Sequence, residues 1–136
     1  WPALWHHLVD TPNTKKFVAA FNGKFRRPPE NQAWGEYCSL KIVAQSMTET
    51  KSTDPTKIVE HFEKGAKFDV LKSRESYFRA RDHQMMTEMY AITALPQAQV
   101  KNQWDIFSSS PPVPSPNESL EVIAATEEEN KCTFRT

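Results

Sequence analysis

The sequence predicts an α/β fold in which helices pack on a small sheet and a proline-rich segment follows them. Apolar residues recur at helical spacing in the first half of the chain, and short apolar stretches typical of strands lie between residues 67 and 95. A third observation is the cluster of prolines in residues 108–116. The 136 residues are enough for one modest domain with one core.

Two of the three predicted helices begin with clear capping signals. The first follows Thr11 and Pro12, and the third follows Asp54 and Pro55. A Thr or Asp N-cap before a proline at the first helical position is a typical helix start. The first helix should end before the two adjacent prolines that follow it, and the third should end at Gly65.

The longest predicted helix spans residues 31–47 and runs on to about residue 50. Its opening turn carries an indole, a carboxylate and a phenol, from Trp34, Glu36 and Tyr37. We interpret this cluster as a place that meets a ligand, while the body of the helix lies on a core. The stripe expected to face that core consists of Ala33, Tyr37, Leu40, Ala44 and Met47.

Three strands are predicted after the third helix, over residues 67–71, 76–81 and 87–95. The last of them has apolar residues on both faces, among them Tyr90, Ala91 and Ile92. Such a pattern is typical of a strand that is covered on both sides by helices.

We divide the chain into a domain over residues 1–107 and a proline-rich spacer with a C-terminal strap over residues 108–136. Residues 108–116 are predicted to be extended and polyproline-like. An apolar island of Trp104, Ile106 and Phe107 precedes them. A short helix that follows is expected to lie across the surface of the domain.

The two cysteines allow two interpretations. A Cys38–Cys132 disulfide would tie the strap to the longest helix, because Cys38 lies off the predicted core stripe and something apolar should cover that flank. Closing so long a loop would stabilise the fold by roughly 4–5 kcal/mol and would indicate an oxidising compartment. The alternative is two unrelated buried thiols.

Composition excludes several classes of function. Lys and Arg together number 17, as do Asp and Glu, so no net field attracts nucleic acid or an anionic membrane. No stretch is long enough to span a membrane, and no secretory leader is visible. The first residue is Trp1, so a leader of a secreted protein would lie upstream.

Enzyme chemistry finds little support in the sequence. None of the motifs GxSxG, GxGxxG, HExxH or a Walker-type loop is present. His6 and His7 are adjacent and therefore point in different directions, so we predict no metal site from them. Asp82 and His83 could form an acid/base pair, but no nucleophile accompanies them. We predict a protein that is not an enzyme and needs no cofactor.

Several stretches between residues 13 and 95 follow known patterns in order. They are residues 17–31, which resemble FVxAFxxKxxxxPPEN with one position fewer before the prolines, residues 37–47, which resemble YxAxKxxAxAM, the Ser-Thr-Asp turn at 52–54, and residues 68–69, 78–79 and 82–84. Together they resemble type I periplasmic solute-binding proteins of ABC importers, the leucine/isoleucine/valine-binding family. Arg26 and Arg27 depart from the glycine that the family usually carries there.

The resemblance covers only the C-terminal portion of such proteins, so it implies a partial type I periplasmic-binding-protein fold. It implies a two-lobed protein that closes on a small solute, such as an amino acid or amide. An aromatic residue matching Tyr37 contacts the ligand in this family, and from their position in the same turn we add Trp34 and Glu36. The expected partners are the solute, the ABC permease subunits and the missing N-terminal lobe of the same protein, in the periplasm.

An alternative function is a stand-alone interaction or accessory subunit. In that interpretation the proline-rich tail and the island of Trp104, Ile106 and Phe107 hold a partner protein. The upstream gene sequence separates the two: a signal peptide and further βα units in frame favour the solute-binding protein, and a start codon just before Trp1 favours the subunit.

Overall fold

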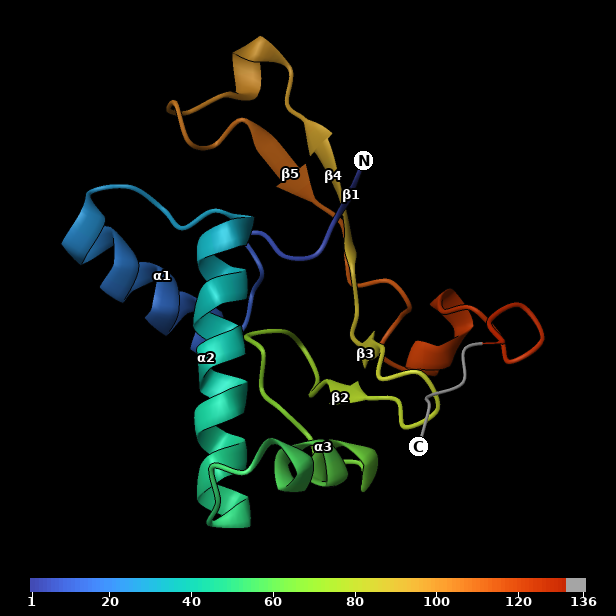
Figure 1. Cartoon of the computed structure of the whole chain (residues 1–136). Helices are drawn as coiled ribbons and strands as arrows, with labels where there is room; N and C mark the ends of the chain where they lie inside the picture. Colours follow the sequence, from blue (N-terminus) through green and yellow to red (C-terminus); the bar gives the residue numbers. More distant parts are fainter. Residues whose placement is uncertain (132–136) are drawn as a thin grey trace.

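The computed structural model describes residues 1–131 as a mixed α/β fold with three α-helices and two small antiparallel sheets (Figure 1). In chain order the elements are β1 (Pro2–Ala3), α1 (Pro12–Phe25), α2 (Asn31–Thr50), α3 (Pro55–Glu63), β2 (Tyr77–Phe78), β3 (Met85–Met86), β4 (Tyr90–Ala94), the 3-10 helix η1 (Gln97–Gln99), β5 (Phe107–Ser109) and the 3-10 helix η2 (Leu120–Ile123).

The capping signals predicted the helix starts correctly. The Thr11 hydroxyl accepts a hydrogen bond from the Thr14 backbone N–H at 3.2 Å, and the Asp54 carboxylate accepts one from the Thr56 N–H at 2.9 Å. Both helices carry a proline in their first turn. The third helix stops just before Gly65, whose φ of 83° lies in the left-handed region that glycine adopts without strain.

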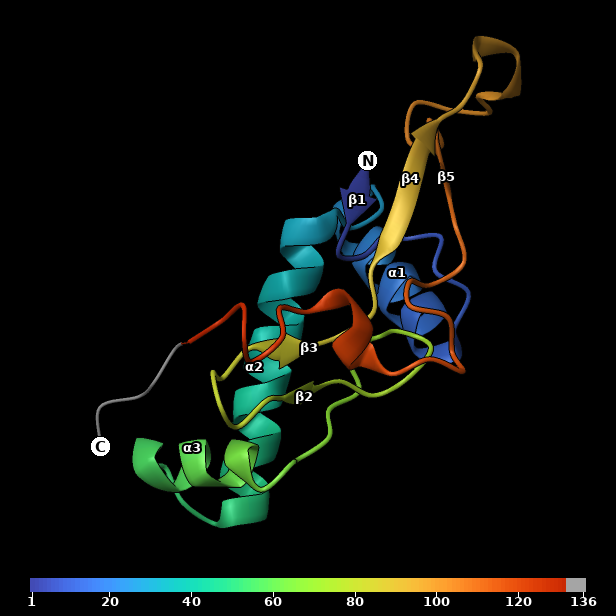
Figure 2. The same cartoon turned by 90° about the vertical axis from the view of Figure 1, so that its right-hand side faces the viewer.

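The strands are shorter and more numerous than the sequence predicted. Of the stretch 67–71, only Phe68 pairs, in an isolated bridge with Ser76. The three-stranded sheet has the order β1-β4-β5, and β2 pairs with β3. Figure 2 shows β4 and β5 running out together from the helical part, with η1 at their far end.

The expectation that the last predicted strand is buried on both faces is wrong. In β4 the side chains of Tyr90 and Ile92 are buried, whereas Ala91 and Thr93 between them are exposed. The alternation is that of a strand with one face on a core. The apolar residues on its second face therefore misled the prediction.

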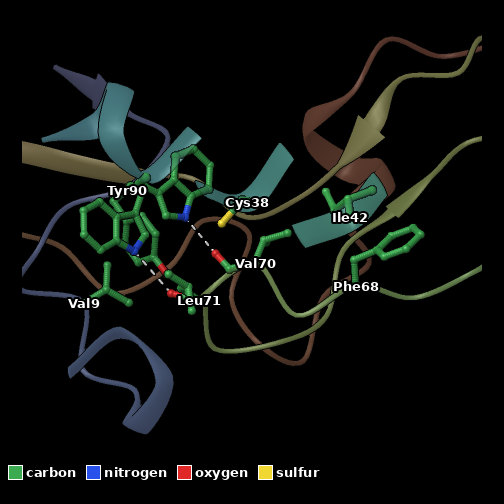
Figure 3. Packing of buried hydrophobic residues seen from close by; sticks show 9 residues of the cluster. Val9, Cys38, Ile42, Phe68, Val70, Leu71 and Tyr90 are labelled. Carbon is green, nitrogen blue, oxygen red and sulfur yellow. Dashed lines mark hydrogen bonds between the residues drawn. The ribbon is translucent and has the colours of Figure 1, made fainter. Parts of the chain in front are cut away.

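The core lies between the inner side of α2 and the segment 68–71 (Figure 3). Two indole N–H groups fix this segment, because Trp34 Nε1 donates to the Val70 carbonyl at 2.8 Å and Trp5 Nε1 donates to the Leu71 carbonyl at 3.3 Å. The buried cluster consists of Trp5, Val9, Trp34, Cys38, Ile42, Phe68, Val70, Leu71 and Tyr90.

The predicted orientation of α2 is wrong. Its buried residues are Trp34, Cys38, Ile42 and Ser46, which repeat every four positions, whereas Leu40 of the predicted stripe is 72% exposed. Two faces of this helix are apolar, and the one that carries the large indole packs on the described core. The sequence pattern alone could not rank one face above the other.

This orientation removes the reason for the predicted disulfide. Cys38 needs no cover from the C-terminal segment, because it is buried in the core cluster and is free among the described residues. Burial raises the pKa of its thiol to about 11, so it is protonated at neutral pH. Cys132 lies outside the described residues, and the Cys38–Cys132 pairing stays a prediction.

The segment after β5 is tied to the domain by arginine side chains. Arg74 donates to the carbonyls of Glu118 at 2.6 Å and Pro114 at 3.0 Å, and Arg81 donates to the Ala125 carbonyl at 2.6 Å. Arg79, between them, bonds the Glu121 carboxylate at 2.7 Å. The predicted boundary at 107/108 falls inside β5, and the division into two parts stays a prediction.

Replacing Arg79 by alanine should loosen this segment. The Arg79 guanidinium is buried and binds Asp82 as well as Glu121, and it holds the pKa of Asp82 at about 2. Without it, we expect limited proteolysis of residues 117–130 to accelerate roughly tenfold, because local opening becomes easier. The matched control is Arg26→Ala, at an exposed arginine that makes none of these contacts. Equal cleavage of both variants and the parent would contradict this role.

Candidate functional site

Trp34, Glu36 and Tyr37 lie in one turn of α2 but point in different directions. With 100° of rotation per residue, Glu36 lies about 200° and Tyr37 about 300° around the helix from Trp34. Trp34 is buried, at 6% exposure, and its ring stacks on Trp5 with centroids 6.1 Å apart and planes 4° apart. The indole N–H is already used by Val70. Trp34 is therefore part of the core.

Tyr37 and Glu36 keep exposed side chains. The Tyr37 ring is 44% exposed and lies 4.6 Å from the ring of Phe17 in α1. It borders a shallow hollow of about 310 Å³ beside Lys41 and Asp69, which pair at 3.0 Å. The structure does not gather the three predicted contact residues into one site, and their contact with a ligand stays a prediction.

A larger hollow, of about 480 Å³, lies at the N-terminal end of α2. We call it the α2 hollow. Three segments far apart in the sequence form most of it: the N-terminal segment, the connection between α1 and α2, and the stretch that leads into β5. Ile92 of β4 adds to the lining. Its main lining residues are Trp1, Trp5, His6, His7, Arg27, Glu30, Asn31, Trp104, Ile106 and Phe107.

Two histidines form one wall of the α2 hollow, and sequence reasoning did not select them. Their rings stack at 4.3 Å between centroids. Burial lowers the pKa of His6 to about 4, and the neighbouring His7 adds to the effect. Burial also lowers the pKa of His7, although the Asp105 carboxylate, which accepts a hydrogen bond from this ring, acts in the opposite direction. At neutral pH both rings are therefore uncharged. His6 Nδ1 already accepts a hydrogen bond from the Leu8 backbone N–H at 3.3 Å, and His7 Nε2 lies 3.6 Å from Asp105, so each ring has one nitrogen left for a ligand.

A charged pair and an amide also line the α2 hollow. The guanidinium of Arg27 forms an ion pair with the carboxylate of Glu30 and lowers the pKa of Glu30. The Asn31 side-chain oxygen accepts a hydrogen bond from the backbone N–H of Trp5 at 3.0 Å. This bond fixes the start of α2 to the N-terminal segment. The α2 hollow thus combines aromatic surface with a few placed polar groups, as small-molecule sites do.

A buried polar network lies behind Trp34. Lys72 Nζ sits 4.9 Å from the Trp34 ring centroid and donates to the Thr87 hydroxyl at 2.8 Å and to the Glu88 carbonyl at 2.5 Å. The fully buried Glu88 carboxylate accepts hydrogen bonds from the Tyr90 hydroxyl at 2.6 Å and from the Ser73 N–H at 2.8 Å. The network contacts the Trp34 indole through the Lys72 amine.

Stability should depend on pH through Lys72. Burial lowers its pKa from 10.5 to about 8, so between these two values the unfolded chain binds more protons than the folded one. The Lys72 contribution to the free energy of unfolding should therefore rise with pH, by up to about 1.4 kcal/mol per pH unit. Urea unfolding across that range measures it. The variant Lys72→Met should lack this rise, and superimposable pH profiles would contradict the assignment.

Asp82 and His83, at the turn after β2, each have a charged partner from another position. Arg79 holds the carboxylate of Asp82, while His83 Nε2 lies 2.8 Å from a carboxylate oxygen of Glu63 in α3. Within residues 1–131, no three His, Cys, Asp or Glu side chains gather so that they could hold a metal ion.

The model of the periplasmic binding protein family matches residues 1–99. The chain belongs to the periplasmic binding protein family. That family consists of solute-binding proteins rather than enzymes. Among the described residues of this periplasmic binding protein, no helix has the length and apolar character needed to cross a membrane.

Solved structures agree with the fold of a periplasmic binding protein. An amino acid ABC transporter substrate-binding protein from Pseudomonas fluorescens Pf-5 matches with a TM-score of 0.72 and 23% identity, over 80% of this chain and 29% of that chain. A periplasmic binding protein from Burkholderia mallei matches with a TM-score of 0.79 and 19% identity, over 96% of this chain and 32% of that chain. A comparison with curated proteins finds no match.

The chain thus spans about a third of the length of these solved structures. The predicted relationship to the C-terminal portion of a periplasmic solute-binding protein is confirmed at the level of family and fold.

Proposed function

We propose that these residues are part of the solute-binding component of an ABC importer, located in the periplasm, which captures a small solute between two lobes by hinge closure. The family match over residues 1–99 supports the binding role. The proposed partners are the solute, the permease subunits in the membrane and the remaining lobe of the same protein.

The observation that carries the proposal is the α2 hollow. Its volume of about 480 Å³ suits a small molecule, and aromatic rings surround its polar groups. The neutral His6 and His7 rings and the Asn31 amide can hydrogen-bond an uncharged group, and the pair of Arg27 and Glu30 presents both signs of charge. An amino acid or an amide-like solute fits this mixture.

Of the three contacts that the sequence predicts, we propose a direct role for two. Tyr37 and Glu36 have exposed side chains, which a solute or the opposing lobe can reach. Trp34 is committed to the core, and its proposed role is to hold the start of α2 in place.

The test is a solute panel on the protein expressed from its complete reading frame. Thermal unfolding is followed with the common L-amino acids and their amides. We expect at least one solute to raise the midpoint, since a ligand at 100 times its dissociation constant stabilises by about 2.7 kcal/mol. Trp104→Ala, in the α2 hollow, should weaken the shift, and Phe25→Ala, at an exposed aromatic outside it, should not. Absence of any shift across the panel would contradict the proposal.

A second candidate is the stand-alone interaction or accessory subunit. The observation in its favour is that Trp104 and Ile106 are 43% and 41% exposed, beside the exposed Trp1. Contiguous exposed apolar surface is typical of protein contact sites. The upstream gene sequence distinguishes the two functions, because only the importer component requires further βα units in the same frame.

A further inference from the structure

Helix α2 carries apolar side chains on two opposite faces. One face, with Trp34, Cys38 and Ile42, is buried in the core. The other, which we call the outer face, consists of Leu40, Val43, Ala44 and Met47. At 100° per residue the centres of these two faces lie about 170° apart. An apolar helix face of this kind is normally packed against another part of the protein.

The described part of the chain leaves most of the outer face uncovered. Leu40 is 72% and Val43 is 41% exposed, Ala44 is exposed as well, and Met47 at the end of the face is half-buried. In Figure 1, α3, β2 and β3 lie to the right of α2, and no other segment of residues 1–131 lies against the lower left side of the helix.

Scattered exposure of single apolar residues would need no explanation. The outer face differs because its four residues follow the helical spacing i, i+3, i+4 and i+7 over two turns, which is the spacing of a packed helix face. The sequence pattern indicated a core contact on this side of α2 for the same reason. The structure thus leaves a packing surface without its packing partner among the described residues.

The comparisons indicate what the partner is. Both solved structures superpose on most of this chain, yet the matched part is only 29% and 32% of their length. The larger share of a protein with this fold therefore lies outside the matched part. We propose that the outer face of α2 is the docking surface for an apolar surface of the remainder of the same polypeptide. The contact is intramolecular and does not depend on the solute.

Thiol labelling of the protein from the complete reading frame tests this. Ala44→Cys places a thiol on the outer face, and Ser39→Cys places one at an exposed position of the same helix that lies off this face. Both are small residues, so the substitutions are matched. Leu40→Cys, at a position on the outer face that is 72% exposed, keeps the test informative if Ala44→Cys disturbs folding. Labelling is read at each site by peptide mass spectrometry.

We expect the thiols at positions 44 and 40 to react at least about tenfold more slowly than the one at position 39 in the native protein, and all three to react alike in guanidinium. Equal native rates would overturn the proposal. Protection that disappears on dilution, together with dissociation of a dimer, would identify a second copy as the partner and would overturn it too.

Discussion

Replacing Trp34 by alanine is expected to lower the free energy of unfolding by about 3–5 kcal/mol, as for other buried tryptophans. The change removes an indole that is 6% exposed, its hydrogen bond to the Val70 carbonyl, its stacking on Trp5 and its contact with the Lys72 amine. Urea unfolding followed by far-ultraviolet circular dichroism measures the loss.

Tyr37→Ala is the matched comparison, three residues further along the same helix. Because its ring is 44% exposed, we expect a loss of about 1 kcal/mol or less. Equal destabilisation by the two substitutions would contradict the assignment of Trp34 to the core.

Glu88→Gln is the second substitution with a large expected effect, about 3 kcal/mol of unfolding free energy. The carboxylate is fully buried and accepts hydrogen bonds from the Ser73 N–H, the Ser73 hydroxyl and the Tyr90 hydroxyl. It also lies 3.4 Å from the Arg74 guanidinium. An amide supplies one acceptor oxygen instead of two and turns a donor toward other donors.

Glu75→Gln makes the same chemical change at an exposed glutamate on the same connection. Urea unfolding of the two variants should separate them, with Glu75→Gln close to the parent protein. A Glu88→Gln variant as stable as the Glu75→Gln variant would show that the buried network adds nothing to stability.

Local chemistry made the helix boundaries predictable. Thr11 and Asp54 act as N-caps through their own side chains, and such bonds depend only on residues two or three positions away. Short strands such as β3 and β5 were not predictable in the same way, because their pairing partners lie elsewhere in the chain.

The face of α2 that packs on the described core was not predictable for a different reason. Leu40 and Ile42 are both strongly apolar, so the periodicity indicated two apolar faces of α2. It did not indicate which of the two packs on the core. The decision came from tertiary contacts of Trp34 with Trp5 and Val70, which lie 29 and 36 positions away.

The α2 hollow was harder still to predict, because its walls come from three distant segments. His6, Arg27 and Trp104 carry no shared motif, and only the fold brings them to one place. The sequence did contain one indication of this hollow, namely the aromatic residues Trp1 and Trp104. Large aromatic side chains that stay exposed are typical of contact sites.

Small-angle scattering of the protein from the complete reading frame, with and without the solute that stabilises it most, tests the central claim most directly. Capture between two lobes predicts that the radius of gyration decreases on binding, and that the decrease is lost when the solute is removed by dialysis. Binding with an unchanged radius of gyration would contradict hinge closure around a solute.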